Sequence, residues 1–136
     1  MKVAVAVGLF AAFAHGAAPN GLVGRTNAPN GIVVDVRCDG DDGLTQRLCD
    51  ATKRAFASSE DFTLSDGKQG DTLIVEIPTN VGWKKVQGRM RVFYAVELSA
   101  KDAKRSGLHR GSCSDAELGR CAAQIVSWAR RTISHR

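Results

Sequence analysis

The stretch Asp71-Thr-Leu-Ile-Val-Glu-Ile-Pro78 and the longer stretch Val86 to Leu98 that follows it decide the fold of this 136-residue chain. A β-strand points successive side chains to opposite faces, so a strand with one buried face carries apolar residues at every second position. Both stretches alternate in this way. One face would be formed by Leu73, Val75 and Ile77 of the first, and by Val86, Met90, Val92, Tyr94, Val96 and Leu98 of the second. We therefore predict a β-hairpin at the centre of the fold.

The segment between the two strands carries turn signals. Pro78 has no amide hydrogen to give to the strand ladder, so it ends the first strand. Gly82 lies within Asn80 to Lys85, the segment that we expect to form the turn. This turn would place Trp83, Lys84 and Lys85 at the tip of the hairpin.

Four further elements are predicted around the hairpin. They are a strand at Ile32 to Arg37, a helix at about Asp42 to Ser58, a brief strand at Asp61 to Leu64, and a helix from Ser114 to about Ile133. Asp41 and Asp42 suit the start of the first helix, where acids offset the helix dipole. Ser114-Asp-Ala-Glu117 has the form of a capping box at the start of the second. Ala100 to Ser112 is expected to be a polar loop.

The predicted order is strand, helix, strand, strand, strand, helix. A right-handed crossover puts the first helix on one face of the sheet, where the last helix most easily joins it. We predict an α+β fold, a two-layer sandwich with a mainly antiparallel sheet and both helices on one face. The other face would be open to a partner or a second copy of the chain, and would carry Val33, Ile74, Phe93 and Ala95 among Asp35, Arg37, Glu76, Arg89, Arg91 and Glu97.

The start of the chain has the layout of a secretory signal peptide. Lys2 precedes an apolar run from Val3 to Phe13, which is too short to span a bilayer. Cleavage after Gly16 fits better than cleavage after Ala18, which would leave Pro19 directly after the cut. We expect a signal peptide at 1–16, a flexible Gly/Pro/Asn-rich leader at 17–30 and one domain at 31–136, with no transmembrane segment. A periplasmic or secreted location follows from this layout.

Four cysteines in an exported chain indicate two disulfides rather than a metal site. Neither Cys38 and Cys49 nor Cys113 and Cys121 has the close spacing of zinc ligands. The local pairings, Cys38 with Cys49 and Cys113 with Cys121, require each loop to fold back along a helix. Pairing Cys38 with Cys113 and Cys49 with Cys121 is feasible if the two helices lie side by side. The local pairs are favoured, and the second pairing stays open.

The first half of the domain resembles a known family. The pattern consists of an apolar strand, a helix with Gly43-Leu-Thr-Gln-Arg-Leu48 and Ala55-Phe56-Ala-Ser-Ser59, then Asp61-Phe-Thr-Leu64 and a hairpin. Over residues 31 to 99 it resembles the amino-terminal domain of the periplasmic TolB protein and related envelope accessory domains. The resemblance implies a non-catalytic domain that acts through protein partners. Because the chain has four cysteines and no propeller follows, no partner site is carried over.

Two groups of residues invite a chemical interpretation. Asp39-Gly-Asp-Asp-Gly43 lacks the ligands and the glycine that an EF-hand loop requires, so an acid-rich helix start explains it better. His109 would have to carry any histidine-based catalysis, but its neighbours indicate an exposed loop. We therefore predict no catalytic residue, no metal site and no cofactor. A small hydrolase or metal-dependent protein that uses Asp39 to Asp42 with His109 remains an alternative.

The strongest binding candidate is the hairpin. Aromatic side chains beside cations can anchor an acidic surface, and the candidates are Trp83, Lys84, Lys85, Arg89, Arg91 and Phe93. The net charge of the chain is only +5, and most basic residues are interleaved with acids, which argues against nucleic acid as the partner. Our main hypothesis is an exported, non-enzymatic module that binds an envelope protein. A binder of an anionic polymer or lipid surface is a further alternative.

Overall fold

The computed structural model of the chain describes residues 31–67, 73–100 and 106–134. The predicted signal peptide and leader, at residues 1–30, lie outside the described residues. In chain order the elements are β1 (Ile32–Cys38), α2 (Gly43–Ala57), β2 (Phe62–Leu64), β3 (Leu73–Ile77), β4 (Gly82–Val86), β5 (Arg89–Ser99), β6 (Ser106–Ser114), a 3-10 turn η1 (Asp115–Glu117) and α3 (Leu118–Ser134).

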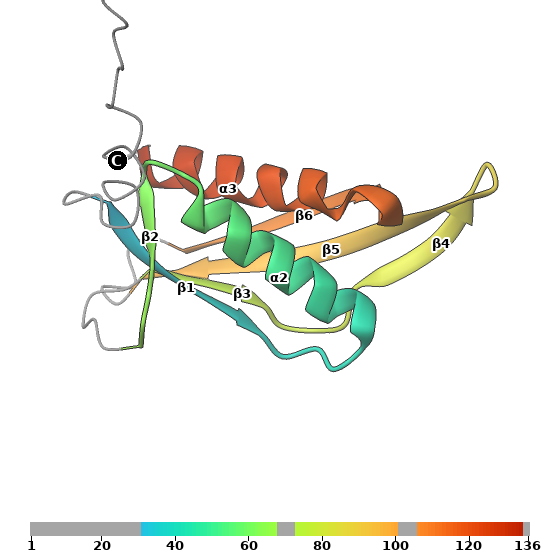
Figure 1. Cartoon of the computed structure of the whole chain (residues 1–136), viewed down its shortest axis with the longest axis horizontal. Coiled ribbons are helices and arrows are strands. Elements are labelled where there is room, and N and C mark those ends of the chain that lie inside the picture. Colours follow the sequence, from blue (N-terminus) through green and yellow to red (C-terminus); the bar gives the residue numbers. More distant parts are fainter. Residues whose placement is uncertain (1–30, 68–72, 101–105, 135–136) are drawn as a thin grey trace, which may run out of the picture.

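The predicted α+β class is confirmed, and the structure adds two strands to it. β4 lies largely inside the segment predicted as a turn, and β6 lies largely inside the segment predicted as a polar loop. Figure 1 shows both helices on the same side of the sheet, as expected. The observed fold is an open, two-layer arrangement of a six-stranded sheet and two helices.

β5 organises the sheet. One of its edges pairs with β3 near Glu97 to Ser99 and with β4 at Arg89 to Phe93, so that β3 and β4 follow each other along the same edge. The other edge pairs with β6 from Arg91 to Ser99. β1 is parallel to both β2 and β3, whereas the three pairings of β5 are antiparallel.

The alternation of β5 buries one face under the helices. Val92, Tyr94, Val96 and Leu98 are at most 4% exposed, as the sequence predicted. Val86 is an exception to that prediction. It pairs with Arg89, whose side chain lies on the opposite face to Met90, and it is exposed.

The helix starts differ in how they are capped. Asp42 caps α2, because its Oδ1 accepts a hydrogen bond from the Thr45 amide at 2.6 Å. The capping box predicted at Ser114 is wrong, since its side chain makes no capping hydrogen bond and the 3-10 turn Asp115–Glu117 precedes α3. A 3-10 turn tightens the backbone at a helix end and so changes where the first free amides lie.

Both disulfides are local. Cys38 at the end of β1 is bonded to Cys49 in α2, with a Cα–Cα distance of 6.3 Å. Cys113 in β6 is bonded to Cys121 in α3, with a Cα–Cα distance of 5.6 Å. Each bridge therefore ties one helix to one strand. Among the residues that the structure describes, no helix is long and apolar enough to cross a membrane.

Candidate functional site

The predicted binding residues gather on a ribbon formed by β4 and the start of β5, which β6 joins from Arg91 onward. The strands pair from Gly82 opposite Phe93 to Val86 opposite Arg89. Figure 1 shows this ribbon extending past the ends of both helices. Trp83, Lys84 and Lys85 therefore lie within a strand and not at the hairpin tip, where the sequence argument placed them.

The tip is formed by Gln87 and Gly88, which have positive φ angles of 52° and 76°. A two-residue loop with both φ angles positive is a type I′ turn, whose twist matches that of the flanking strands. The turn predicted at Asn80 to Lys85 is wrong, because Gly82–Val86 form the strand β4. The strand was not recognised because all five of its residues are exposed. A strand that is exposed on both faces has no need of the apolar alternation used to recognise it.

The two faces of the ribbon each combine cations with apolar side chains. On the face away from the helices, Lys84 lies opposite Arg91, and its Nζ is 5.3 Å from the centre of the Phe93 ring. That distance is within the range of a cation–π interaction. On the other face, Trp83 pairs with Val92, and Lys85 pairs with Met90. All six predicted binding residues therefore belong to one projecting structure.

Residues 82–93 contain four cations and no acid. Trp83 is 59% exposed, Val86 39% and Phe93 38%, although large apolar side chains are usually buried. Arg91 is held in place by its Nε, which donates a hydrogen bond to Ser112 Oγ at 3.1 Å. The ribbon thus presents positive charge and apolar area together, a combination suited to an acidic surface with apolar contacts.

The Asp39 to Asp42 turn has a structural explanation. Asn80 Oδ1 accepts hydrogen bonds from the amides of Asp41 and Asp42 at 2.9 and 3.3 Å, and Asn80 Nδ2 donates to Asp41 Oδ1 at 3.1 Å. Asp42 also caps α2. These contacts fix the start of α2 against the segment that leads into β4. Within the described residues, no group of three histidine, cysteine, aspartate or glutamate side chains could hold a metal ion.

His109 lies in β6 and is half-buried, so the exposed loop predicted for it is wrong. Its ring stacks on Trp128 of α3 with a centroid distance of 5.2 Å. Arg37, Glu76, Glu97 and Leu108 form one row across the sheet, so β1 and β6 are three strand spacings, about 14 Å, apart. The acidic turn after β1 and His109 do not converge on one site.

A polar cluster connects His109 to α3. His109 Nε2 lies 3.0 Å from the Tyr94 oxygen, and the Tyr94 hydroxyl donates to Gln124 Oε1 at 2.8 Å. Gly111 leaves room for this cluster, because a Cβ at that position would lie 2.6 Å from Tyr94 Cζ. Burial raises the pKa of Tyr94 to about 12, so its hydroxyl stays protonated and remains a donor at neutral pH.

The open sheet face carries opposed charges at its β1–β3 side. Arg37 Nε and Asp35 Oδ2 form an ion pair at 2.7 Å. Glu76 lies between Arg37 and Glu97 in the strand register. A hydrogen bond with Asp39, partial burial, and the negative charges of Asp39 and Glu97 raise the pKa of Glu76, although Arg37 opposes them. The homodimer predicted for this face stays a prediction.

We expect Glu76→Gln to stabilise the protein at neutral pH. Because the pKa of Glu76 is raised in the folded state, stability is lost as the pH rises through that pKa and the carboxylate forms. The neutral amide avoids this loss, so the melting temperature at pH 7 should rise by about 1–4 °C, a small effect because Glu76 is only partly buried. The difference should shrink as the pH falls below about 4, where glutamate becomes mostly protonated in the unfolded state as well.

Asp35→Asn on the same face is the matched control. It removes one negative charge but breaks the ion pair with Arg37, so we expect no increase in melting temperature. A similar increase in both variants would mean that net charge, rather than the surroundings of Glu76, causes the effect. Thermal unfolding followed by circular dichroism between pH 3.5 and pH 8 measures both.

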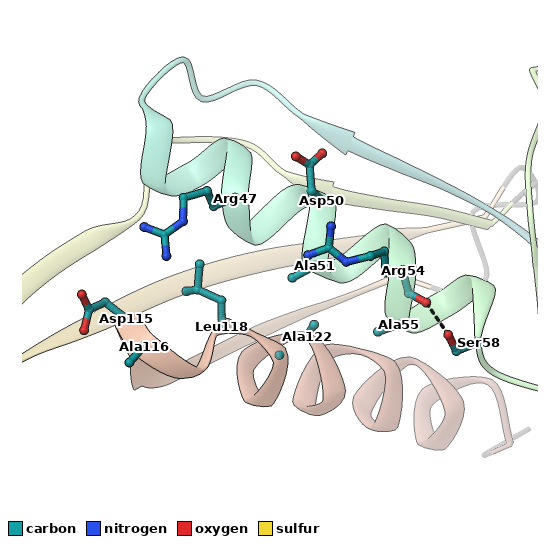
Figure 2. Close-up of a pocket in the computed structure, with 11 residues that line it drawn as sticks. Arg47, Asp50, Ala51, Arg54, Ala55, Ser58, Asp115, Ala116, Leu118 and Ala122 are labelled. Carbon is teal, nitrogen blue, oxygen red and sulfur yellow. Dashed lines mark hydrogen bonds between the residues drawn. The ribbon is translucent and has the colours of Figure 1, made fainter.

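A further hollow of about 500 Å³ lies between the helices. Figure 2 shows Leu118 and Ala122 of α3 pointing toward α2, with the Arg47 and Arg54 side chains of α2 at the rim. This groove is not predictable from the motifs of the sequence. Its only sequence signal is the small size of Ala51 and Ala55 on the facing stripe of α2, which leaves space between the two helices.

Comparison with known proteins identifies no family. No protein-family model matches the chain, and no curated protein matches it. One similar solved structure is the crystal structure of a minor lipoprotein from Acinetobacter baumannii. It is 10% identical, with a TM-score of 0.41, over 71% of this chain and 94% of the lipoprotein chain. No link to the TolB family emerges from these comparisons.

Proposed function

We propose that this protein is an exported, non-enzymatic binding module whose β4–β5 ribbon docks an acidic segment of an envelope protein. The observation that carries the proposal is the ribbon itself, which projects beyond the helices with four cations, three exposed apolar side chains and no acid. The signal-peptide pattern at residues 1–16 and the two disulfides support export, because disulfides persist in oxidising compartments. The resemblance of residues 31–99 to the TolB amino-terminal domain supports an envelope partner.

The free edge of β4 favours a protein partner. Among the described strands, β4 pairs with β5 alone, so its other edge offers backbone groups to an extended segment. Lys84 and Lys85 disfavour pairing with a second copy of β4, because the lysines of the two copies would repel each other. An extended segment with acidic side chains would instead gain from both the edge and the charges. A lipid surface could use only the charges and the apolar side chains.

An acidic peptide tests this proposal. Trp128→Phe leaves Trp83 as the only tryptophan, so its emission reports on the ribbon. We expect an extended Glu-rich peptide to shift this emission to the blue, and Lys84→Glu with Lys85→Glu to weaken binding by roughly tenfold or more. Arg47→Glu with Arg54→Glu makes the same charge change on α2 and should leave the affinity within about twofold of the parent.

Two outcomes would contradict the proposal. If vesicles containing phosphatidylglycerol shift the emission and the peptide does not, the ribbon serves a lipid surface. If both double variants lose affinity equally, net charge alone drives binding. The native partner can be sought in an envelope pull-down with the wild type, Trp83→Ala/Arg89→Glu/Arg91→Glu and the α2 control. We expect a protein that the wild type and the control retain and the ribbon variant loses.

A further inference from the structure

A second cationic surface lies along the outer edge of β6, beside α3. A hollow of about 730 Å³ opens there, and its lining includes Arg91, Arg110, Arg120 and Arg131 together with His109 and Gln124. None of its lining residues is an aspartate or a glutamate. We call this hollow the arginine groove. Four guanidinium groups around one hollow without a carboxylate repel each other and attract anions.

The arginines of the groove are available for a ligand. In the part of the chain that the structure describes, no carboxylate pairs with Arg91, Arg110 or Arg131. Arg120 pairs with Glu117 at 3.0 Å, but the two side chains are 75% and 50% exposed. Exposed ion pairs of this kind contribute little free energy, so a ligand can replace Glu117.

The walls of the groove are held by a continuous chain of hydrogen bonds. His109 contacts the Tyr94 hydroxyl, which donates to Gln124 Oε1. Gln124 Nε2 donates to the Ser112 carbonyl at 3.3 Å, and Ser112 Oγ accepts from Arg91 Nε. The chain joins β5, β6 and α3, so the site is organised before a ligand arrives, which lowers the entropic cost of binding.

The positive charge around the groove affects the protonation of His109, which also lines the groove. Burial, followed by the positive charge of Arg131, lowers the pKa of His109. An anion bound between Arg131 and the sheet would neutralise this field. His109 itself is not needed as a cation, because the four arginines are charged at any physiological pH.

The groove is too long for one small anion. Arg120 and Arg131 lie on one stripe of α3, eleven residues apart, which corresponds to about 16 Å along the helix. The forked donors of arginine match the oxygens of phosphate groups. We propose that the arginine groove binds a row of phosphate groups, carried either on a soluble polyphosphorylated chain or on the headgroups of an anionic phospholipid surface.

The test uses tripolyphosphate, orthophosphate, and phosphatidylcholine vesicles with and without phosphatidylglycerol, all at about 0.15 M salt to screen nonspecific attraction. Titration calorimetry and thermal shift measure soluble binding, and co-sedimentation measures vesicle binding. We expect tripolyphosphate to bind at least roughly tenfold more tightly than orthophosphate if several arginines contact linked phosphate groups at the same time. Vesicle binding that requires phosphatidylglycerol and is not displaced by tripolyphosphate would identify the headgroups as the source.

Arg110→Ser with Arg131→Ser is the decisive variant, because both side chains are exposed and lie outside the ribbon. We expect it to weaken binding by roughly tenfold or more, since hydrogen bonds to charged groups are the strong ones. Arg47→Ser with Arg54→Ser also removes two positive charges, but from α2, and should leave the affinity within about twofold of the wild-type value. Equal losses in both variants, or no binding of either phosphate source by the wild type, would overturn the proposal.

This inference stands apart from the proposed ribbon function, although Arg91 belongs to both surfaces. Lys84→Glu with Lys85→Glu should weaken binding of the acidic peptide by roughly tenfold or more and preserve binding of tripolyphosphate. The groove variant should show the reverse. The failure of one proposal can therefore be recognised while the other is still supported.

Discussion

Phe56→Ala lowers the free energy of unfolding by about 3–5 kcal/mol, the range for truncation of a buried phenylalanine. The Phe56 side chain is fully buried, and its ring meets that of Phe62 edge to face at 4.9 Å with an interplanar angle of 88°. Truncation removes this aromatic contact and leaves a cavity between α2 and β2 that the surrounding elements can fill only in part. Urea denaturation followed by circular dichroism measures the loss.

The same truncation at Phe93 is the control. Phe93 lies on the open face and is 38% exposed, so Phe93→Ala should cost less than about 1 kcal/mol. Phe56→Leu should lie between the two, because it keeps most of the buried volume. A loss below about 1 kcal/mol for Phe56→Ala would contradict the packing of α2 on the sheet.

Sequence alone predicts those parts of the fold in which one face of an element is buried. The alternation of Val92, Tyr94, Val96 and Leu98 identified β5 because each of these side chains is buried under the helices. α2 was found from its apolar stripe. The stripe did not reveal that Thr45 and Thr52 are also fully buried. Both buried hydroxyl groups make hydrogen bonds. Thr52 Oγ1 donates to the carbonyl of Leu48 in the same helix at 2.8 Å. Thr45 Oγ1 accepts from the amide of Val81, which lies outside the helix, at 2.9 Å.

The strands β4 and β6 were not predicted, and both failures have the same physical cause. β4 is exposed on both faces, and β6 is an edge strand with Gly107 and Gly111 in its interior. Their positions are maintained by backbone pairing with β5, and a backbone ladder leaves no trace in the side-chain pattern. A Cβ at position 107 would lie 3.2 Å from the Trp128 ring, closer than most such contacts, so glycine lets this ring lie close to the strand. Glycines that sequence analysis assigns to a loop here allow α3 to approach the strand.

The ribbon and the arginine groove also differ in how far the sequence predicts them. The residues of the ribbon could be named as candidates, since Trp83 to Phe93 are close in the sequence, but the ribbon itself was missed because its turn lies at Gln87 and Gly88. The arginine groove could not be predicted, because it joins Arg91 of β5 and the unpredicted strand β6 to α3. Its available signal was the polar stripe of α3 formed by Arg120, Gln124, Ser127 and Arg131. A polar stripe on a helix normally indicates only a solvated face.

Replacing Cys113 and Cys121 with alanine lowers the free energy of unfolding by about 2–3 kcal/mol, the effect of releasing a short loop in the unfolded chain. Both cysteines are buried, and their separation in sequence is eight residues. Cys38→Ala with Cys49→Ala opens a loop with a separation of eleven residues and is expected to lower stability by a similar amount. Thermal and urea unfolding of the two double variants compare them directly.

The two disulfides connect different elements. A comparison of the two double variants therefore distinguishes an effect on the arginine groove from a general loss of stability. Cys113–Cys121 joins β6 to α3, the two walls of the arginine groove, whereas Cys38–Cys49 joins β1 to α2. At a temperature where both variants are folded, Cys113→Ala/Cys121→Ala should weaken tripolyphosphate binding, because the spacing between Arg110 and Arg131 is no longer fixed. Cys38→Ala/Cys49→Ala should bind as the wild type does. Equal affinities in both variants would mean that the hydrogen bonds through Tyr94 and Gln124 hold the groove without the bridge.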